Sequence, residues 1–159
     1  MDIKNVVVAG GGVLGSQIAF QAAYCGFNVT VWLRSEDSIT RTQPKIDHLK
    51  EVYLETIRNM ATPEGQTPQT WARGIADFET FDMETCLAKA EAAYKNLKLE
   101  LDWGKAFADA DLVIESLAEN AEEKIAFYKK LAPVLPEKTI VVTNSSTLLP
   151  SKFVKYIGR

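Results

Sequence analysis

The chain has 159 residues, of which 47% are hydrophobic and 25% charged, and its formal net charge is −3. This size and balance are typical of one globular domain with a buried core. A slightly acidic chain does not favour a nucleic-acid partner, which would need a basic patch. No apolar run is long enough to span a bilayer, and the first one, residues 6–9, ends in glycines without a signal-peptide cleavage site. We therefore expect a cytoplasmic protein with neither a nucleic-acid nor a membrane partner.

The cysteines and the histidine do not predict a metal site. Cys25 and Cys86 are far apart and lack CxxC spacing, and His48 is the only histidine. A zinc site needs about four clustered ligands. Both cysteines are expected to be buried thiols, and His48 is expected to be a surface or packing residue on a helix.

The first part of the chain predicts a βαβ unit. Residues 3–9 form a short apolar, β-branched run of the kind found in buried parallel strands. A glycine turn follows, and residues 13–25 then have helical spacing that ends at Gly26, as at a helix C-terminus. Residues 28–33 predict the second strand. A parallel crossover of this kind is almost always right-handed.

The middle of the chain, about residues 38–94, predicts a helical excursion outside the sheet. Residues 38–60 have helical spacing, with Pro44 as a candidate break in the first part. Residues 61–70 are rich in Pro, Gly, Gln and Thr and predict a loop. Helical spacing returns in residues 71–94, so the excursion is expected to form a hairpin.

The alternation of strands and helices then resumes. Short apolar or alternating runs predict further strands, amphipathic runs predict helices between them, and a last short helix is expected near the end of the chain. The predicted fold class is therefore α/β: a Rossmann-type, doubly wound and mainly parallel sheet over residues 1–159, with the helical excursion after the second strand. The strands are expected at 97–101, 111–116 and 139–143, and the helices at 103–108, 121–131 and 151–156.

The glycine turn matches the pattern GxGxxG, after a predicted strand and before a predicted helix, which is the context that a dinucleotide site requires. Gly10 would permit the tight turn, Gly12 would let a pyrophosphate approach the backbone, and Gly15 would let helix and strand pack closely. The helix start, at Val13 and Leu14, would offer unpaired N–H groups and a partial positive charge. The alternative is a glycine-rich turn without a ligand, but three glycines at these positions are unfavourable unless close approach is needed.

The end of the second strand predicts which cofactor is preferred. An NAD-binding domain usually carries Asp or Glu here, and this chain has Leu33, followed by Arg34 and Ser35. A guanidinium can clamp a 2′-phosphate through paired, charge-assisted hydrogen bonds. We therefore expect NADP(H) to be favoured, with NAD(H) as the second cofactor. In the alternative, Arg34 is a solvated charge and Glu36 or Asp37 reaches the ribose.

Longer motifs accompany the glycine turn, and two of them, DADLVIE at 109–115 and TNSSTL at 143–148, are much more specific than the turn. Together, in this order and over nearly the whole chain, they resemble the N-terminal NAD(P)-binding domain of the 3-hydroxyacyl-CoA dehydrogenase family, including its diketoreductase-like and 3-hydroxybutyryl-CoA dehydrogenase-like members. The matching segments are residues 8–19, residues 108–115, Glu119–Asn120 with Lys124, and residues 143–150.

The resemblance implies an oxidoreductase of fatty acid metabolism that transfers a hydride between NAD(P)(H) and a 3-hydroxyacyl-CoA-like or related hydroxy or keto substrate. It implies that Glu119 and Lys124 contact the cofactor, and that Asn144 and Ser146 lie at the nicotinamide and substrate end. Ser146 matches the serine that hydrogen-bonds the reacting oxygen. The alternatives are an exposed helix-start acid, a solvated lysine and an ordinary polar turn after a strand.

The resemblance also implies a catalytic His–Glu pair just beyond the TNSS segment, and a helical C-terminal domain that supplies a dimer interface. The sequence reaches Gly158 and Arg159 without either feature. We therefore expect the chain to bind the cofactor but to be inactive alone, and the full-length enzyme to be a homodimer. The excursion matches the CoA-binding region of the family too loosely for individual residues to be assigned.

Three other functions are compatible with parts of the sequence. A non-catalytic dinucleotide-binding sensor remains open because a fold does not fix a function. A flavin-binding domain would give a yellow protein. Tyr94 and Lys98 fit the YxxxK pattern of short-chain dehydrogenases, but Lys98 lies in a predicted strand and not on the same helix face as Tyr94.

Overall fold

The computed structural model describes residues 2–158 and contains a sheet of five parallel strands in the order β3-β2-β1-β4-β5. From β1 the chain adds β2 and then β3 on one side of the sheet. It then returns to add β4 and β5 on the other side of β1. This reversal between β1 and β4 is the mark of a doubly wound Rossmann sheet, so the predicted fold class is confirmed. The strands are β1 Asn5–Ala9, β2 Asn28–Trp32, β3 Lys98–Glu100, β4 Leu112–Glu115 and β5 Ile140–Thr143.

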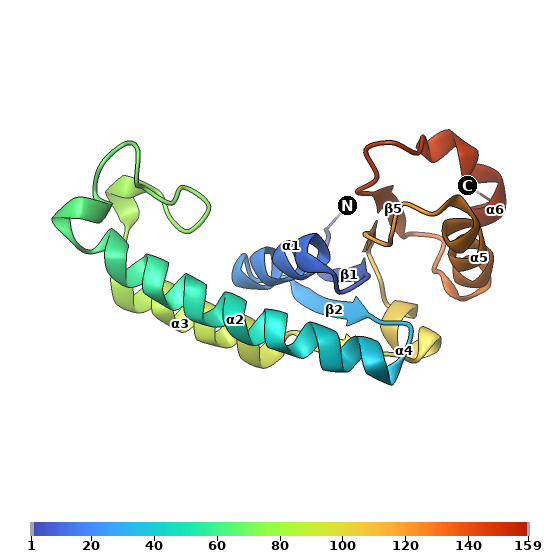
Figure 1. Ribbon diagram of the computed structural model, residues 1–159, viewed down its shortest axis with the longest axis horizontal. Coiled ribbons are helices and arrows are strands. Elements are labelled where there is room, and N and C mark those ends of the chain that lie inside the picture. The colour runs from blue at the N-terminus through green and yellow to red at the C-terminus, as the bar shows by residue number, and fades with distance from the viewer. Residues whose placement is uncertain (1, 159) are drawn as a thin grey trace.

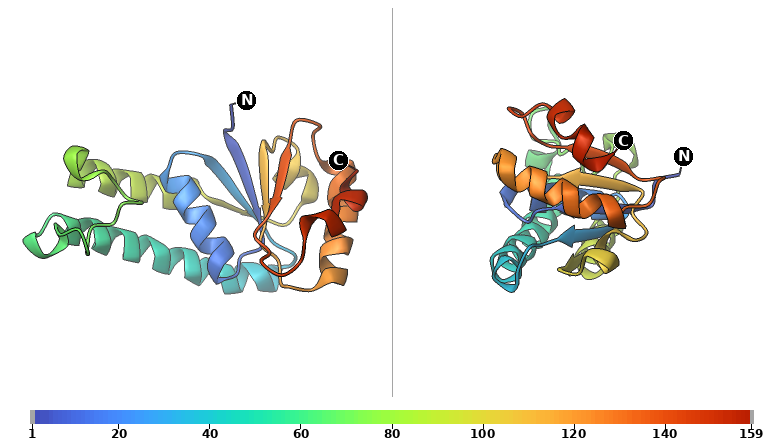
Figure 2. Two further views of the ribbon diagram at one scale, coloured as in Figure 1. Left: turned by 90° about the horizontal axis from the view of Figure 1, so that it is seen from above. Right: turned by 90° about the vertical axis from the view of Figure 1, so that its right-hand side faces the viewer.

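Helices cover both faces of the sheet (Figures 1 and 2). Val6 and Val8 of β1 pack into one core with the first three helices, while Val7 and Ala9 pack into a second core with the later helices. Successive strand residues point to opposite faces, so a continuous apolar run can serve both cores. The helices are α1 Val13–Tyr24, α2 Glu36–Met60 and α3 Met83–Asn96 on one side, and α4 Trp103–Phe107, α5 Ala121–Leu131 and the short α6 Val154–Ile157 on the other.

Helices α2 and α3 form a hairpin that extends well beyond the sheet (Figure 1). Helix α2 runs unbroken through 25 residues, so the predicted break at Pro44 is wrong. Pro44 removes one helical hydrogen bond, but buried residues on either side of it, Thr42 and Ile46, hold the helix against the body of the domain. Ser35 caps the helix start by accepting a hydrogen bond from the N–H of Ser38 at 3.3 Å.

The helix predicted from residue 71 begins only at Met83, where the carboxylate of Asp82 accepts a hydrogen bond from the N–H of Thr85 at 2.9 Å. Residues 61–82 instead form a loop with single turns at Pro63–Gly65 and Phe78–Thr80. The ring of Trp71 packs edge-on against those of Phe78 and Phe81, at 5.0 and 5.2 Å between centroids. The apolar residues of this segment therefore serve a small aromatic cluster in the loop and not a helix face.

The two cysteines are both free thiols, but only Cys86 is buried as predicted, and Cys25 is exposed at the end of α1. Among residues 2–158, no group of three or more His, Cys, Asp or Glu side chains is arranged to hold a metal ion. Within the same residues, no helix has both the length and the apolar character needed to cross a membrane.

Asp111 ties the beginning of β4 to β1 and is the clearest source of pH-dependent stability. Its carboxylate accepts hydrogen bonds from the backbone N–H groups of Lys4 and Asn5, at 2.9 and 2.8 Å, and from Nζ of Lys138 at 2.5 Å. The bond from Lys138, followed by those from Asn5 and Lys4, holds the pKa of Asp111 well below its usual value. Ionised Asp111 therefore stabilises the fold above the unfolded-state pKa of about 4, and this contribution is lost as the pH falls toward the lower folded-state pKa.

We expect Asp111→Asn to lower the melting temperature at neutral pH and to flatten the decline in stability below about pH 4. Thermal unfolding at a series of pH values measures both effects. Asp109→Asn, two residues earlier and exposed, is the matched control and should change neither. Identical pH profiles for the two variants would contradict the assignment.

Candidate functional site

A cleft of about 800 Å³ opens at the carboxyl ends of the central strands. It is bounded by the glycine turn after β1, the start of α2 and the loops that follow β4 and β5. It lies where the strand order reverses between β1 and β4, which is where open α/β sheets bind ligands. Its size is within the range of about 300–1,000 Å³ that is usual for small-molecule and cofactor sites.

The glycines of the turn all line the cleft but have different roles, and Gly12 is the one whose Cβ position is open. Gly10 has a φ of +114°, and an added Cβ would lie 2.5 Å from the carbonyl oxygen of Ser116. A Cβ on Gly15 would lie 2.3 Å from the carbonyl oxygen of Gly10, so both positions need glycine for packing. At Gly12, by contrast, no neighbouring atom of the described chain lies within 4 Å of the Cβ position. The Gly12 backbone is thus open to a ligand.

Gly11 also has a structural role, which the sequence pattern did not predict. Its carbonyl oxygen accepts hydrogen bonds from the hydroxyls of Ser16 and Thr42, both at 3.1 Å. An added Cβ would lie 2.2 Å from Oγ1 of Thr42. The GxGxxG pattern allows any residue at position 11. The run of three consecutive glycines at 10–12 was the feature of the sequence that could have indicated a need for glycine there. Gly11 and Thr42 together lock the turn against α2.

The start of α1 presents apolar side chains and backbone N–H groups to the cleft. Val13 and Leu14 line the cleft and are 68% and 51% exposed. No side chain caps this helix end, where Gly12 is the N-cap. The first N–H groups of a helix have no partner within the helix and can bind an anion.

At the end of β2, Leu33 is buried and Arg34 lines the cleft. The guanidinium of Arg34 lies 3.7 Å from the carboxylate of Glu123 on α5. Ser35, predicted with Arg34 as a phosphate contact, caps α2 and is not among the residues that line the cleft. Ser38, one turn later, takes the lining position.

Further cations that the sequence reasoning did not single out line the same end of the cleft: Arg41 and Lys45 from α2 and Lys130 from α5. Nη2 of Arg41 donates to the hydroxyl of Ser38 at 3.1 Å, and Nζ of Lys45 donates to the carbonyl oxygen of Arg41 at 2.9 Å. Positions 34, 38, 41 and 45 are three or four residues apart, which places them along one side of α2 and its approach. This spacing was the signal that could have revealed them.

Three aromatic residues also line the cleft. Trp32, Trp103 and Phe127 line the cleft, with ring centroids 4.5 Å apart for Trp32 and Trp103 and 5.6 Å for Trp103 and Phe127. Trp32 and Phe127 are only 5% and 4% exposed, so the half-buried Trp103 offers most of the accessible aromatic surface of a cleft that also carries several positive charges. Such a pairing suits a heteroaromatic ring that carries phosphate groups.

The loop after β5 brings Asn144 and Ser146 to the cleft, together with Glu119 from the loop after β4. The N–H of Asn144 donates to the carbonyl oxygen of Glu115 at 2.8 Å. The hydroxyls of Ser145 and Thr147 donate to the carboxylate of Glu119. Residues 144 and 146 therefore line the cleft, while residues 145 and 147 bind the Glu119 side chain at its rim.

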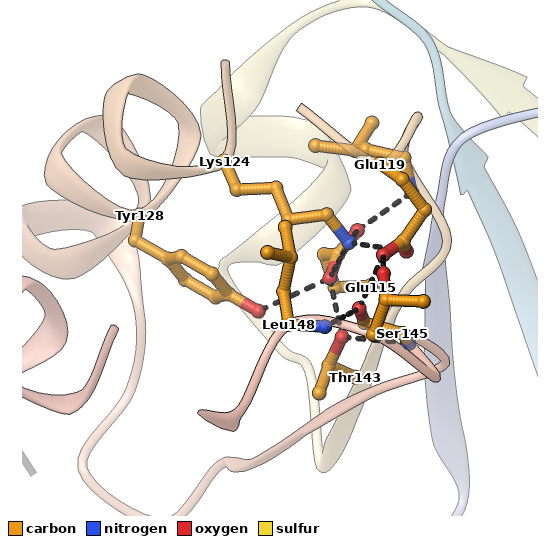
Figure 3. A network of polar contacts seen from close by, with 9 residues as sticks. Glu115, Glu119, Lys124, Tyr128, Thr143, Ser145 and Leu148 are labelled. Atoms are coloured by element: carbon orange, nitrogen blue, oxygen red, sulfur yellow. Dashed lines mark hydrogen bonds and ion pairs between the residues drawn. The ribbon is translucent and has the colours of Figure 1, made fainter. Parts of the chain in front are cut away.

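Lys124 does not line the cleft. Its ammonium group lies between the carboxylates of Glu115 and Glu119 (Figure 3). Its side chain is 1% exposed, so the alternative of a solvated lysine is wrong. Nζ of Lys124 lies 3.0 Å from both carboxylate oxygens of Glu115 and 3.3 Å from Oε1 of Glu119. Glu115 is the last residue of the DADLVIE motif, and the motif match alone gave no role for this buried side chain. A cofactor contact by Lys124 stays a prediction.

The fold and the cleft define a dinucleotide-binding domain of the Rossmann type. The sequence profile of the family described as "3-hydroxyacyl-CoA dehydrogenase, NAD binding domain" matches residues 5–159. The chain belongs to this family, which confirms the resemblance drawn from the motifs.

Individual relatives agree with this assignment. Human mitochondrial hydroxyacyl-coenzyme A dehydrogenase is 26% identical over 146 residues, which are 92% of this chain and 40% of that protein. A probable 3-hydroxybutyryl-CoA dehydrogenase of Bacillus subtilis is 28% identical over 148 residues, 93% of this chain and 42% of the other. A solved diketoreductase superposes with a TM-score of 0.76 and 38% identity, covering 100% of this chain and 47% of its own. The chain thus spans less than half the length of these relatives.

Proposed function

We propose that this chain is the cofactor-binding part of an oxidoreductase that transfers a hydride between NAD(P)(H) and a 3-hydroxyacyl-CoA-like or related hydroxy or keto substrate. The observation that carries the proposal is the open backbone of Gly12 at the uncapped start of α1, inside the cleft at the switch point of the sheet. The pyrophosphate is proposed to lie over Gly12 and to accept hydrogen bonds from the N–H groups there. The bound cofactor supplies the hydride chemistry.

The nicotinamide and substrate are proposed to lie at the Asn144 and Ser146 end of the cleft. Ser146 would donate a hydrogen bond from its hydroxyl to the reacting oxygen. The general base is proposed to come from outside this chain, because His48 is exposed on α2 and does not line the cleft. We accordingly propose that the chain alone binds cofactor without turnover. The family resemblance alone supports the further proposal that the full-length enzyme is a homodimer.

The adenosine end is proposed to favour NADP(H). Arg34, Arg41 and Lys45 give this end a concentration of positive charge, and Leu33 cannot accept a hydrogen bond from a ribose hydroxyl. Guanidinium groups bind phosphate through paired, charge-assisted hydrogen bonds. Glu123 competes for the guanidinium of Arg34, so a 2′-phosphate would have to replace this exposed ion pair, which contributes little by itself.

We expect Arg34→Ala to weaken NADPH binding roughly 10-fold and to leave NADH binding nearly unchanged, because the change removes a charge-assisted hydrogen bond to the 2′-phosphate. Calorimetric titration with each nucleotide at low salt measures the two affinities. Arg58→Ala, exposed on the distal part of α2, is the matched control. Equal losses for the two nucleotides in Arg34→Ala would refute the phosphate clamp while leaving the dinucleotide site in place.

A further inference from the structure

A buried ion pair joins β4 to α5, next to the loop residues 116–119 that line the cleft. The side chains of Glu115 and Lys124 are 0% and 1% exposed. Besides Nζ of Lys124, the Glu115 carboxylate accepts hydrogen bonds from the N–H of Leu117 at 2.7 Å and from the hydroxyl of Thr143 at 2.5 Å. The hydroxyl of Tyr128 adds a contact at 3.4 Å (Figure 3). The partners of Glu115 thus come from the loop after β4, from α5 and from the end of β5.

Lys124 connects this buried pair to the rim of the cleft through Glu119. Glu119 is 44% exposed, and its Oε1 accepts the lysine at 3.3 Å. Its Oε2 accepts the hydroxyl of Ser145 at 2.7 Å and that of Thr147. The bonds from Thr147 and Ser145 hold the pKa of Glu119 below its usual value, so the carboxylate stays ionised as an acceptor at neutral pH.

This chain of contacts sets the orientation of the loop after β5. The hydroxyl of Thr143 accepts the N–H of Ser145 at 3.0 Å, and the hydroxyl of Ser145 accepts the N–H of Leu148 at 3.1 Å. With the side chains at 145 and 147 turned toward Glu119, Asn144 and Ser146 face the cleft. Holding a loop in its binding conformation before the ligand arrives lowers the entropy that binding must overcome.

We propose that Glu115 and Lys124 are positioning residues for the nicotinamide end of the cleft. They act through Glu119 on the Ser145 and Thr147 hydroxyls and thereby fix Asn144 and Ser146. This inference rests on the proposed function, since it takes the 144–146 end of the cleft as the place of the nicotinamide. It predicts an effect confined to that half of the dinucleotide.

The first test removes the two hydroxyls that connect the loop to Glu119. Ser145→Ala combined with Thr147→Val leaves both residues similar in size and changes no side chain that lines the cleft. NADH and ADP-ribose, which lacks the nicotinamide, are titrated calorimetrically against this variant and the native chain. The native chain should bind NADH more tightly than ADP-ribose. The variant should lose roughly 10-fold in NADH affinity and less than about twofold in ADP-ribose affinity.

A second variant changes the buried pair itself and leaves no unpaired charge in the interior. Glu115→Gln combined with Lys124→Met makes both side chains neutral, a kind of exchange that buried ion pairs often tolerate. It should show the same selective loss of NADH affinity. It should also speed amide hydrogen exchange in residues 144–148 relative to the native chain while leaving residues 5–9 of β1 unchanged. Thr40→Val, an exposed hydroxyl on α2, is the control for both measurements.

The outcomes separate the inference from the proposed function. Selective loss of NADH affinity with faster exchange in the loop supports positioning by Glu115 and Lys124. Parallel losses for NADH and ADP-ribose, or no change in either, would mean that these residues only stabilise the fold, and the inference would be overturned. If the native chain bound neither ligand, the proposed dinucleotide site itself would be wrong, and the inference with it.

Discussion

Replacing Lys124 by Met is expected to lower the free energy of unfolding by about 3–5 kcal/mol, because it leaves the buried carboxylate of Glu115 without its cation. The hydrogen bonds from Leu117 and Thr143 remain, but neither donor carries a charge. Urea denaturation followed by circular dichroism measures the change. The double variant Lys124→Met with Glu115→Gln should recover most of the lost free energy of unfolding, since a neutral buried pair needs no compensating charge.

The control for Lys124→Met is Lys129→Met, five residues later on the same helix. Lys129 is exposed, and its ammonium group lies 5.3 Å from the centre of the Tyr156 ring. Losing such an exposed contact should change the stability by less than about 1 kcal/mol. If Lys124→Met were no more destabilising than Lys129→Met, the buried pair would not have the energetic role assigned to it.

The second large effect is expected on binding and not on stability. Gly12→Ala should preserve the fold, because the added Cβ meets no neighbouring atom of the described chain and Gly12 has an ordinary φ of −66°. It should weaken NADH and NADPH binding at least roughly 100-fold, because the methyl group separates the pyrophosphate from N–H donors whose charge-assisted bonds contribute about 1.5–3 kcal/mol each. Calorimetry measures the affinities, and thermal unfolding checks the fold.

Gly74→Ala is the matched control, because its added Cβ would meet only the side chain of Gln21, at 3.7 Å, far from the glycine turn. It should leave both stability and affinity close to native. Native-like nucleotide binding by Gly12→Ala would place the pyrophosphate elsewhere. Gly15→Ala, unlike Gly12→Ala, should damage the fold itself, because its Cβ would clash with the Gly10 carbonyl.

The features predicted well from the sequence depend on local patterns. β-branched apolar runs identified β1, β4 and β5, and the GxGxxG spacing placed Gly12 at the start of α1. The boundary of α3 and the continuity of α2 through Pro44 could not be predicted, because both depend on tertiary packing. The aromatic residues near Trp71 mimic helical spacing, yet they pack against one another in a loop.

The candidate site also combines features that local sequence patterns predict with features that depend on tertiary packing. Ser35 caps α2, and a serine followed by two acidic residues at a helix start was an N-cap signal visible in the sequence. A phosphate contact by Ser35 stays a prediction. The motif match found Lys124, but its burial depends on how α5 packs against the end of β4, where its ammonium group meets the carboxylates of Glu115 and Glu119. Arg41 and Lys45 are visible in the sequence as charges and acquire a role only when α2 is placed beside the cleft.

Parallel calorimetric titration of the native chain with NADPH and NADH, at matched low salt, tests most directly whether the cleft is a dinucleotide site. Low salt preserves the contribution of the exposed cations to phosphate binding. Both nucleotides should bind, with NADPH binding more tightly than NADH. Tighter binding of NADH would overturn the cofactor preference alone, and binding of neither nucleotide would contradict the dinucleotide site.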